Sequence, residues 1–352
     1  MKRKLYFVLC LIMGIISCTK ENTNAPATEK SPVSFTLADR NAAVVKSSSE
    51  SSAETKINNY QIFVFNEDGT LDVSGYKNGS GALTLDCSIG KNKSIFALAN
   101  HRENITGKIA RESDLNGIIS SLSDNDIANS LVMSGRQDEN LLGAGKPVTV
   151  GVDRLVAKVK VDKITNNLNP SLGKLTINAM YCINVCGDAP IIHNAEYQCQ
   201  VWYNRKKYEK ESTHDNVNAL ISETGIAANV RNGDKYTVAH CFYVYPNNCI
   251  SDTSEDSFSP RFTRLVVDVT VENDKDRTNK QIPNRYYAID LVVKSEGGVV
   301  TALARNKLYH ITGLDIQRLG SLNPDQPVVL EPFEYSVSVN DWGTGFDKDV
   351  EI

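Results

Sequence analysis

The residues whose types could bind a metal ion are clustered in one stretch of the chain. Cys182, Cys186, His193 and Cys199 follow one another with the spacing C-x3-C-x6-H-x5-C. Thiolate and imidazole groups are good zinc ligands, but this spacing lacks the CxxC pairs that are typical of structural zinc sites. Cys182 and Cys186 also fit ordinary positions on one β-strand. We therefore interpret these cysteines as structural and expect no metal site and no cofactor.

The motifs of the chain do not indicate catalysis. The sequence has only five histidines and contains no HExxH, GxSxG or Walker A motif. The acidic pairs Asp124/Asp126 and Asp347/Asp349 are more simply explained as loop and terminal charges than as a general acid and base. Residues 124–126 begin like a calcium-binding loop but lack the glycine and the closing glutamate of an EF-hand. We expect a protein that is not an enzyme.

A covalent modification is indicated at Cys18. Residues 2–4 are basic, residues 5–16 form an uncharged apolar stretch of 12 residues, and Ser17 precedes the cysteine. Such a stretch is too short to span a bilayer and is typical of the apolar part of a signal peptide. The arrangement resembles the lipobox of bacterial lipoproteins, in which the cysteine thiol receives a diacylglycerol. We predict an exported outer-membrane lipoprotein precursor with a signal peptide at 1–17 and a lipid anchor on Cys18.

Six further cysteines would remain in the exported chain, where disulfides can form. They are Cys87, Cys182, Cys186, Cys199, Cys241 and Cys249. Six cysteines allow about 15 complete pairings, so the sequence leaves their connectivity open. Cys182 and Cys186 would lie ~13 Å apart on one regular strand, which is too far for a disulfide.

Length and charge set the scale of the mature protein. Removing residues 1–17 takes away three basic residues and no acidic ones, which changes the formal net charge from −4 to −7. An acidic chain lacks the basic patch of a nucleic-acid binder, so we expect no nucleic-acid partner. The remaining length suits two domains. We predict a polar tether at 18–31, a first domain at 32–152 and a second domain at 153–352.

The hydrophobic pattern is that of a mostly β protein. Apolar and polar residues alternate at 33–38, 83–89 and 154–161, whereas 57–66 is apolar on both faces near its end, as in a central strand. The clearest helical pattern follows Ser113, with apolar residues at i, i+3, i+4 and i+7. These residues are Leu115, Ile118, Ile119 and Leu122. We predict two β-sandwiches with one or two short helices.

Several segments resemble, in order along the chain, the fimbrillins of the Bacteroidales, which are the subunits of type V pili. They are the isolated strand at 32–40, YQIFVFNEDG at 60–69, the strand that ends in Ala99-Asn100, LVMSG at 131–135, DRLVAKVKVDKI at 153–164, FYVYPN at 242–247 and ARNKLYHITGLDI at 304–316 with the terminal strand that follows. The resemblance implies two transthyretin-like β-sandwich domains and a structural role in a cell-surface fimbria that supports adhesion.

The resemblance also implies an assembly mechanism. In this family, the lipidated precursor reaches the cell surface with its first strand completing its own sheet. A trypsin-like protease then cuts after a basic residue and releases that strand. The apolar groove left behind is a bare sheet edge. The C-terminal strand of another subunit fills it, and repetition of this head-to-tail contact builds a filament.

Carried onto this sequence, the mechanism assigns roles to both ends of the mature chain. The strand at 32–40 would be removed on maturation, and its three inward apolar residues are Val33, Phe35 and Leu37. Arg40 is the predicted processing site, with Lys46 in reserve. The predicted donor strand carries Tyr335, Val337 and Val339 on one face, followed by Trp342.

Alternatives remain open at this point. The chain could be an anchor or tip subunit rather than a stalk subunit, and both end strands could be permanent parts of their own domains. A surface glycan-binding or glycan-degrading lipoprotein shares the export signal, although the tyrosines that fall within strand patterns are more typical of sheet cores. The expected partners are other fimbrial subunits, outer-membrane lipid through Cys18, the maturation protease, and host or bacterial surface ligands.

Overall fold

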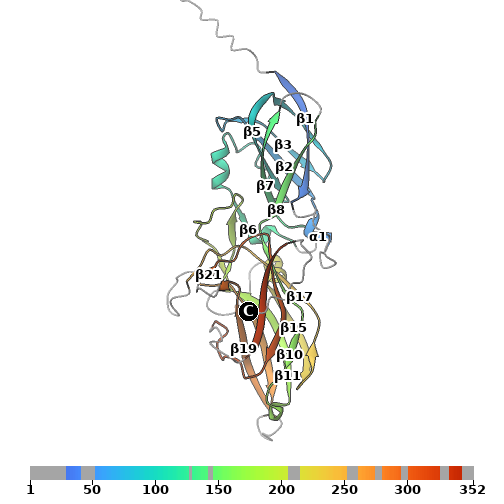
Figure 1. The fold of residues 1–352 in the computed structure, drawn as a ribbon, viewed down its shortest axis with the longest axis vertical. Coiled ribbons are helices and arrows are strands. Elements are labelled where there is room, and N and C mark those ends of the chain that lie inside the picture. The colour runs from blue at the N-terminus through green and yellow to red at the C-terminus, as the bar shows by residue number, and fades with distance from the viewer. Residues whose placement is uncertain are drawn as a thin grey trace, which may run out of the picture.

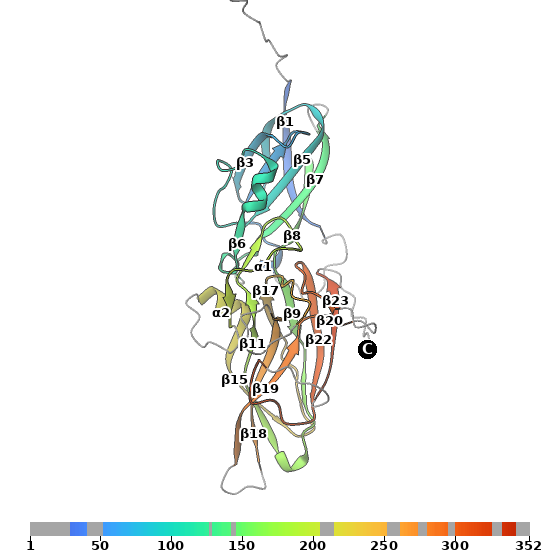
Figure 2. The same cartoon turned by 90° about the vertical axis from the view of Figure 1, so that its left-hand side faces the viewer.

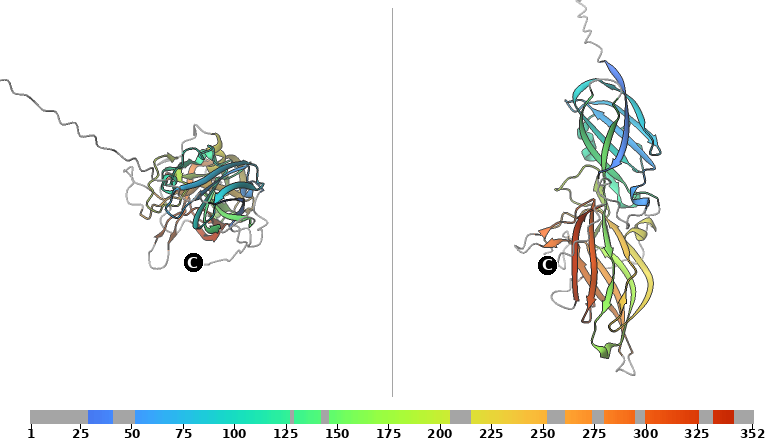
Figure 3. Two further views of the ribbon diagram at one scale, coloured as in Figure 1. Left: turned by 90° about the horizontal axis from the view of Figure 1, so that it is seen from above. Right: turned by 45° about the vertical axis from the view of Figure 1, so that its right-hand side comes forward.

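The computed structural model describes most of the chain between residues 29 and 342 and shows an elongated, mostly β molecule (Figure 1). The residues that it describes are 29–40, 52–126, 129–141, 146–204, 215–251, 261–273, 280–294, 300–325 and 333–342. Two regions built from strands follow one another along the long axis, as Figure 2 and the right-hand view of Figure 3 show; the left-hand view of Figure 3 looks along this axis. Among the described residues, no helix is both long and apolar enough to cross a membrane.

The first region is one curled sheet of seven strands in the order β3-β2-β5-β7-β8-β1-β4. Its strands are β1 (Lys30–Asp39), β2 (Asn59–Phe65), β3 (Leu71–Asn78), β4 (Leu83–Ser88), β5 (Gly90–Ala99), β7 (Met133–Leu141) and β8 (Val148–Arg154). Neighbouring strands are antiparallel, except that β1 and β8 are parallel. A Cβ at Gly75 of β3 would lie 2.6 Å from the Leu85 side chain of β4. The two ends of the sheet therefore approach each other around an apolar interior.

The two-sided apolar pattern of β2 has a simple cause. Because side chains alternate along a strand, Ile62 and Val64 face the interior of the curled sheet, whereas Phe63 and Phe65 face outward. The outward phenylalanines are covered by apolar residues of the segment that follows β5, including Leu115. A strand that is covered on both faces needs apolar residues on both, as the second half of β2 (residues 62–65) has.

The predicted helix after Ser113 is wrong. Glu112–Gly117 form a 3₁₀ turn, strand β6 covers Ile119–Ser121, and a second 3₁₀ turn covers Leu122–Asp124. β6 pairs with β13 (Asp188–Pro190) of the second region. Leu115 and Leu122 are buried, as the helical pattern requires, but Ile119 is 40% exposed. Pairing with a strand that is distant in the sequence thus overrides the local helical pattern.

The second region is a sandwich of two sheets. In the first sheet, β22 pairs in parallel with β9 and β10 along one edge and in antiparallel with β23 along the other, while β17 pairs with β9 and β16 with β10. The strands of this sheet are β9 (Ala157–Val161), β10 (Ile164–Asn166), β16 (Lys235–Tyr236), β17 (His240–Val244), β22 (Lys307–Ile316) and β23 (Phe333–Asp341). The second sheet has the order β15-β11-β18-β19. Its strands are β11 (Lys174–Ile183), β15 (Ser222–Arg231), β18 (Arg264–Glu272) and β19 (Gln281–Asp290).

The remaining elements are small. They are α1 (Ser52–Thr55), α2 (Asp215–Ile221), the 3₁₀ turn Pro170–Leu172, and the strand pairs β12 (Val185–Cys186) with β14 (Trp202–Tyr203) and β20 (Val293–Lys294) with β21 (Val300–Thr301). The helix α1 lies between the two regions (Figure 2). The predicted fold class, mostly β with one or two short helices, is confirmed.

Candidate functional site

Strand β1 lies inside the first region, with a hydrogen-bonded strand on each side. Residues 30–35 pair in antiparallel with β4, and residues 35–39 pair in parallel with β8. Val33 and Phe35 are 4% and 0% exposed and face the apolar interior, where Leu37 is partly buried. Without β1, the edges of β4 and β8 would both be bare and the interior would be open. The first described element of the chain is thus the one that closes its sheet.

Polar contacts add to the fit of β1. The carbonyl oxygen of Phe35 lies 3.1 Å from the hydroxyl of Tyr60, a fully buried residue of β2. The hydroxyl groups of Thr36 and Thr149 are 3.0 Å apart on the outer face. Burial raises the pKa of Tyr60, so its hydroxyl stays protonated and able to donate. β1 is therefore held by backbone ladders, by apolar burial and by polar side chains at specific positions.

Arg40, the predicted processing site, directly follows β1. Its backbone N–H donates to the carbonyl of Val152 at 3.1 Å, and its guanidinium lies 3.2 Å from the carbonyl oxygen of Gly151 and 3.4 Å from Asp153. The side chain is 51% exposed. An exposed ion pair of this kind contributes little to stability. A protease pocket can therefore compete for the side chain at low cost.

A buried ion pair lies one residue before Arg40. Asp39 accepts a hydrogen bond of 2.6 Å from the guanidinium of Arg154, the last residue of β8, and the two side chains are 11% and 0% exposed. The Arg154 Nε–H donates to the backbone carbonyl of Glu54 in α1 at 2.8 Å. The guanidinium also lies over the indole of Trp342, 4.6 Å from the ring centroid. Arg154 thus contacts the first strand, the segment after it and the residue that follows the last strand.

The carboxylate of Glu54 binds three further side chains next to Arg154. It accepts hydrogen bonds from Lys158 Nζ at 2.8 Å, from the Tyr243 hydroxyl at 2.6 Å and from the Trp342 indole N–H at 3.1 Å. Tyr243 and Trp342 stack with centroids 5.8 Å apart. Burial, together with the adjacent Glu54 charge, raises the pKa of Tyr243. Among the described residues, this buried site between the regions therefore holds two carboxylates and two cations.

We name these six residues the junction cluster. They are Asp39, Glu54, Arg154, Lys158, Tyr243 and Trp342. The sequence indicated Trp342 but gave no signal for Glu54, whose indole partner is 288 positions away. Arg154 and Lys158 belong to the segment DRLVAKVKVDKI, where strand alternation alone does not show that both are buried.

The predicted donor strand is β23, which lies at an edge of its sheet and pairs only with β22 among the described strands. The pairing joins Lys307 to Asp341 at one end and Ile316 to Phe333 at the other. Trp342, directly after it, is 1% exposed in the junction cluster. Cys18, Lys46 and the side chains of Tyr335, Val337 and Val339 lie outside the described part of the structure.

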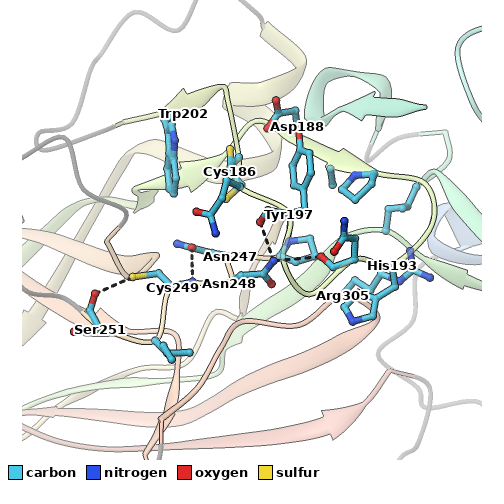
Figure 4. A pocket seen from close by; sticks show the side chains of 18 residues that line it. Cys186, Asp188, His193, Tyr197, Trp202, Asn247, Asn248, Cys249, Ser251 and Arg305 are labelled. Carbon is cyan, nitrogen blue, oxygen red and sulfur yellow. Dashed lines mark hydrogen bonds between the residues drawn. The ribbon is translucent and has the colours of Figure 1, made fainter. Parts of the chain in front are cut away.

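The candidate metal ligands do not converge. Cys182 lies on β11, which ends before Asn184, a residue with a left-handed φ of 53°, so Cys182 and Cys186 are not on one regular strand. Cys182 is fully buried in the core. Cys186, His193 and Cys199 instead line a cavity of about 260 Å³, shown in Figure 4. Within the described residues, no group of three or more His, Cys, Asp or Glu side chains is arranged to hold a metal ion.

Several polar side chains around this cavity donate hydrogen bonds to backbone carbonyls of neighbouring loops. The amide of Asn248 donates to the carbonyl of Tyr197 at 2.9 Å, and that of Asn247 donates to the carbonyl of Arg261 at 2.7 Å. The Arg305 guanidinium donates to the carbonyl of Ile191 at 3.2 Å. These contacts tie the loops after β13 and β17 together. The polar side chains of the cavity wall therefore have a structural role, which is to hold these loops in place.

One family model matches part of the chain, and several solved structures share its fold. Residues 31–172 match the family model described as the major fimbrial subunit protein, FimA. A search of curated protein sequences finds no match to the chain. Among solved structures, a fimbrillin (FimA) from Porphyromonas gingivalis W83 has 16% identity and a TM-score of 0.58, covering 90% of this chain and 99% of the other.

Two further solved structures share the fold. A candidate cell adhesion protein from Parabacteroides distasonis ATCC 8503 has 18% identity and a TM-score of 0.61, over 89% of this chain and 99% of the other. The tip fimbrial protein Mfa3 of Porphyromonas gingivalis, with a C-terminal truncation, has 12% identity and a TM-score of 0.53, over 89% and 99%. At these identities, the likeness establishes the fold alone.

Proposed function

We propose that the chain is a structural subunit of a cell-surface fimbria that is assembled by exchange of strand β1; the match of residues 31–172 to the major fimbrial subunit family supports this role. In this proposal, cleavage after Arg40 releases β1, and the C-terminal strand of another subunit takes its place. The lipid on Cys18, the trypsin-like protease and the domain limits 32–152 and 153–352 are parts of the same proposal. The likeness to solved fimbrillins supports the fold on which it rests.

The observation that carries the proposal is the position of β1. It is the first described element of the chain, yet it lies between two strands and its apolar face is buried. Burial of an apolar side chain of this size stabilises by roughly 1.5–3 kcal/mol, so an empty groove would favour strongly any strand that fills it. An incoming strand recovers both this burial and the backbone ladders to β4 and β8.

The proposed donor has the opposite character. β23 is at a sheet edge and is the last described strand, so it can leave its own sheet without interrupting a connection between other described elements. A strand that pairs on one side only loses fewer hydrogen bonds on departure than a strand that pairs on both sides. These positions support the proposal that the departure of β1 leaves an acceptor groove and that β23 is available for donation.

A glycan-binding role from a different class fits less well. Binding modules for sugars present a cluster of aromatic side chains on one face or in a cleft, because sugar rings stack on them. In the described part of the chain, Tyr76 is the one exposed aromatic side chain, at 42%, and Tyr197 and Trp202, which line the cavity of Figure 4, are partly buried. The family match therefore favours a fimbrial subunit, and whether the chain is processed distinguishes a stalk subunit from an anchor subunit that keeps its lipid and first strand.

The proposal is tested with two variants expressed in the native host. Arg40→Ala removes the processing site, and truncation before Glu334 removes the donor strand. Each variant should reach the surface but fail to form filaments in electron microscopy. Arg102→Ala, which removes another exposed basic residue, should assemble like the wild type. Filaments of normal length from either test variant, with cleavage at other sites excluded by mass spectrometry, would refute strand exchange at these positions.

A further inference from the structure

The segment that would leave and the segment that would replace it share a residue pattern. Residues 33–39 read VSFTLAD, and residues 335–341 read YSVSVND. When aligned without gaps, both read apolar, Ser, apolar, Ser or Thr, apolar, any residue, Asp. The match therefore includes polar positions that apolar burial alone does not require.

The structure shows what the polar positions do in β1. The Thr36 hydroxyl contacts that of Thr149 at 3.0 Å, and the Asp39 carboxylate contacts the buried guanidinium of Arg154 at 2.6 Å. In the alignment, Ser338 replaces Thr36 and Asp341 replaces Asp39. The donor segment thus carries a hydroxyl and a carboxylate at the two β1 positions whose side chains make these contacts.

Other registers lose this agreement. A shift by one residue turns the apolar side chains to the outer face. A shift by two residues in one direction places Asp341 at the position of Leu37, next to the apolar interior. A shift by two in the other direction places Val339 opposite Arg154. Of these registers, only the one that places residues 335–341 at positions 33–39 keeps the apolar residues inward and a carboxylate at Arg154.

We propose that the strand of a second copy of this chain enters the groove in this register, so that its Asp341 takes over the ion pair that Asp39 makes with Arg154. This inference rests on the proposed strand exchange and specifies its register and its partner. Loss of Asp39 removes a carboxylate from a fully buried guanidinium, which is a costly change. A donor with a carboxylate at this position restores the ion pair that Arg154 makes with Asp39. Arg154 thereby selects the register and the kind of strand that is accepted.

Engineered cysteines test the register. Thr149→Cys combined with Ser338→Cys should give ladders of disulfide-linked subunits on non-reducing gels of assembled filaments. Thr149→Cys with Ser336→Cys places the second thiol two residues away and should stay largely unlinked, as should each single variant. Linkage through position 336 instead, or filaments without linkage at 338, would overturn the register. A wild-type protein that forms no filaments would instead contradict the proposed function itself.

A peptide assay tests the ion pair separately. Subunits cut after Arg40 are mixed with a synthetic peptide of residues 333–342 and with the same peptide carrying Asp341→Asn. We expect the asparagine peptide to bind roughly 10- to 100-fold more weakly, as for a charge-assisted hydrogen bond to a buried group. A peptide with Ser336→Ala is the matched control and should bind like the unmodified one. Equal binding of the aspartate and asparagine peptides would refute the role of Asp341.

The cavity of Figure 4 carries a second, independent inference. Cys186 and Cys199 both line it, so the two thiols border the same space. The pairing of β12 with β14 places Trp202 opposite Cys186, and the Gly187 N–H donates to the carbonyl of Val201 at 2.7 Å, so the segment that carries Cys199 runs alongside the one that carries Cys186. A Cβ at Gly187 would lie 2.6 Å from the Tyr203 ring, so this close approach requires glycine.

We infer that Cys186 and Cys199 form a disulfide in the exported protein. Oxidation of the two thiols forms the Cys186–Cys199 bond and releases two protons and two electrons. The disulfide of another protein accepts them and is reduced to two thiols. Cys249 lines the same cavity, but its sulfur lies 3.1 Å from the carbonyl oxygen of Ser251. Because Cys186 is 2% exposed, the bond should form during folding, before the thiol is covered.

Peptide mapping of the exported protein under non-reducing conditions tests this pairing. We expect one linked peptide that joins residues 186 and 199. Cys186→Ser and Cys199→Ser should each lower Tm by roughly 5–10 °C, since a cross-link over a loop of this length restricts the unfolded chain. Cys249→Ser should leave the linked peptide intact. Complete alkylation of all six thiols without reduction, or a bond from Cys186 to Cys249, would overturn the inference.

Discussion

The two ends of the described chain are built in opposite ways. β1 has a hydrogen-bonded neighbour on each side and faces the interior of a curled sheet, whereas β23 has one neighbour and lies at the edge of a sandwich. Removal of β1 would bare the edges of two strands, whereas removal of β23 would bare the edge of β22 alone among the described strands. A chain that accepts a strand at one region and donates one from the other needs this asymmetry.

The largest expected effect is on β1. Phe35→Ala should lower the free energy of unfolding of the uncleaved chain by about 3–5 kcal/mol, because it leaves a cavity in the interior of the first region. Hydrogen exchange of β2 and β5 amides measures this loss locally. Truncation before Glu334 is the comparison and should leave exchange in these strands nearly unchanged. Equal losses of protection in β2 and β5 from Phe35→Ala and from the truncation would contradict the proposed difference between β1 and β23.

The next effect concerns the junction cluster, which both regions share. Glu54→Gln should destabilise the chain by about 3 kcal/mol, because it removes one charge from a buried network with Lys158. Chemical denaturation measures the change, with the exposed Glu196→Gln as control. The contribution of Trp342 to the tryptophan fluorescence should change at the first unfolding transition of the denaturation curve. A loss below about 0.5 kcal/mol, the range of ordinary surface substitutions, would show that the cluster does not join the regions energetically.

A smaller effect should separate the regions by their response to acid. Burial alone would raise the pKa of Asp72, but hydrogen bonds from Lys93 and Ser88 outweigh it and lower the pKa in the folded protein. A lowered pKa contributes stability that is present above the pKa of the unfolded chain, about 4, and is lost as pH falls through the folded value.

The second region has a counterpart in Asp162, whose pKa is lowered by Lys160 and His310 against the effect of burial. The Asp72 side chain is 4% exposed and that of Asp162 is 34% exposed. We therefore expect Asp72→Asn to flatten the acid limb of the stability profile below pH ~4 more than Asp162→Asn does. Thermal melts of both variants between pH 2 and pH 7, roughly the range in which carboxylates titrate, measure this. A larger flattening from Asp162→Asn than from Asp72→Asn would contradict this expected difference between the two regions.

The smallest effect on stability is expected at Arg40. Its ion pair with Asp153 is half exposed, so Arg40→Ala should change the free energy of unfolding by less than about 1 kcal/mol. Differential scanning calorimetry of the uncleaved chain checks this. A larger loss would mean that failure of the variant to assemble reflects misfolding rather than lost processing.

Much of the fold could be predicted from the sequence, because strand alternation is a local signal. Val33 and Phe35 are buried as their spacing predicts, and β2 is central as its two-sided apolar pattern predicts. The helix predicted after Ser113 failed, since β6 pairs with a strand of the other region. The junction cluster could not be predicted, because Glu54 meets Tyr243 and Trp342 only after both regions have folded.

The most direct test of the account is the N-terminal sequence of the subunit in filaments isolated from the cell surface. Cleavage after Arg40 predicts that the sequence begins at Asn41, with mass spectrometry showing that residues 18–40 are absent. A filament subunit that begins at the lipidated Cys18 and retains Val33 and Phe35 would contradict strand exchange in this protein.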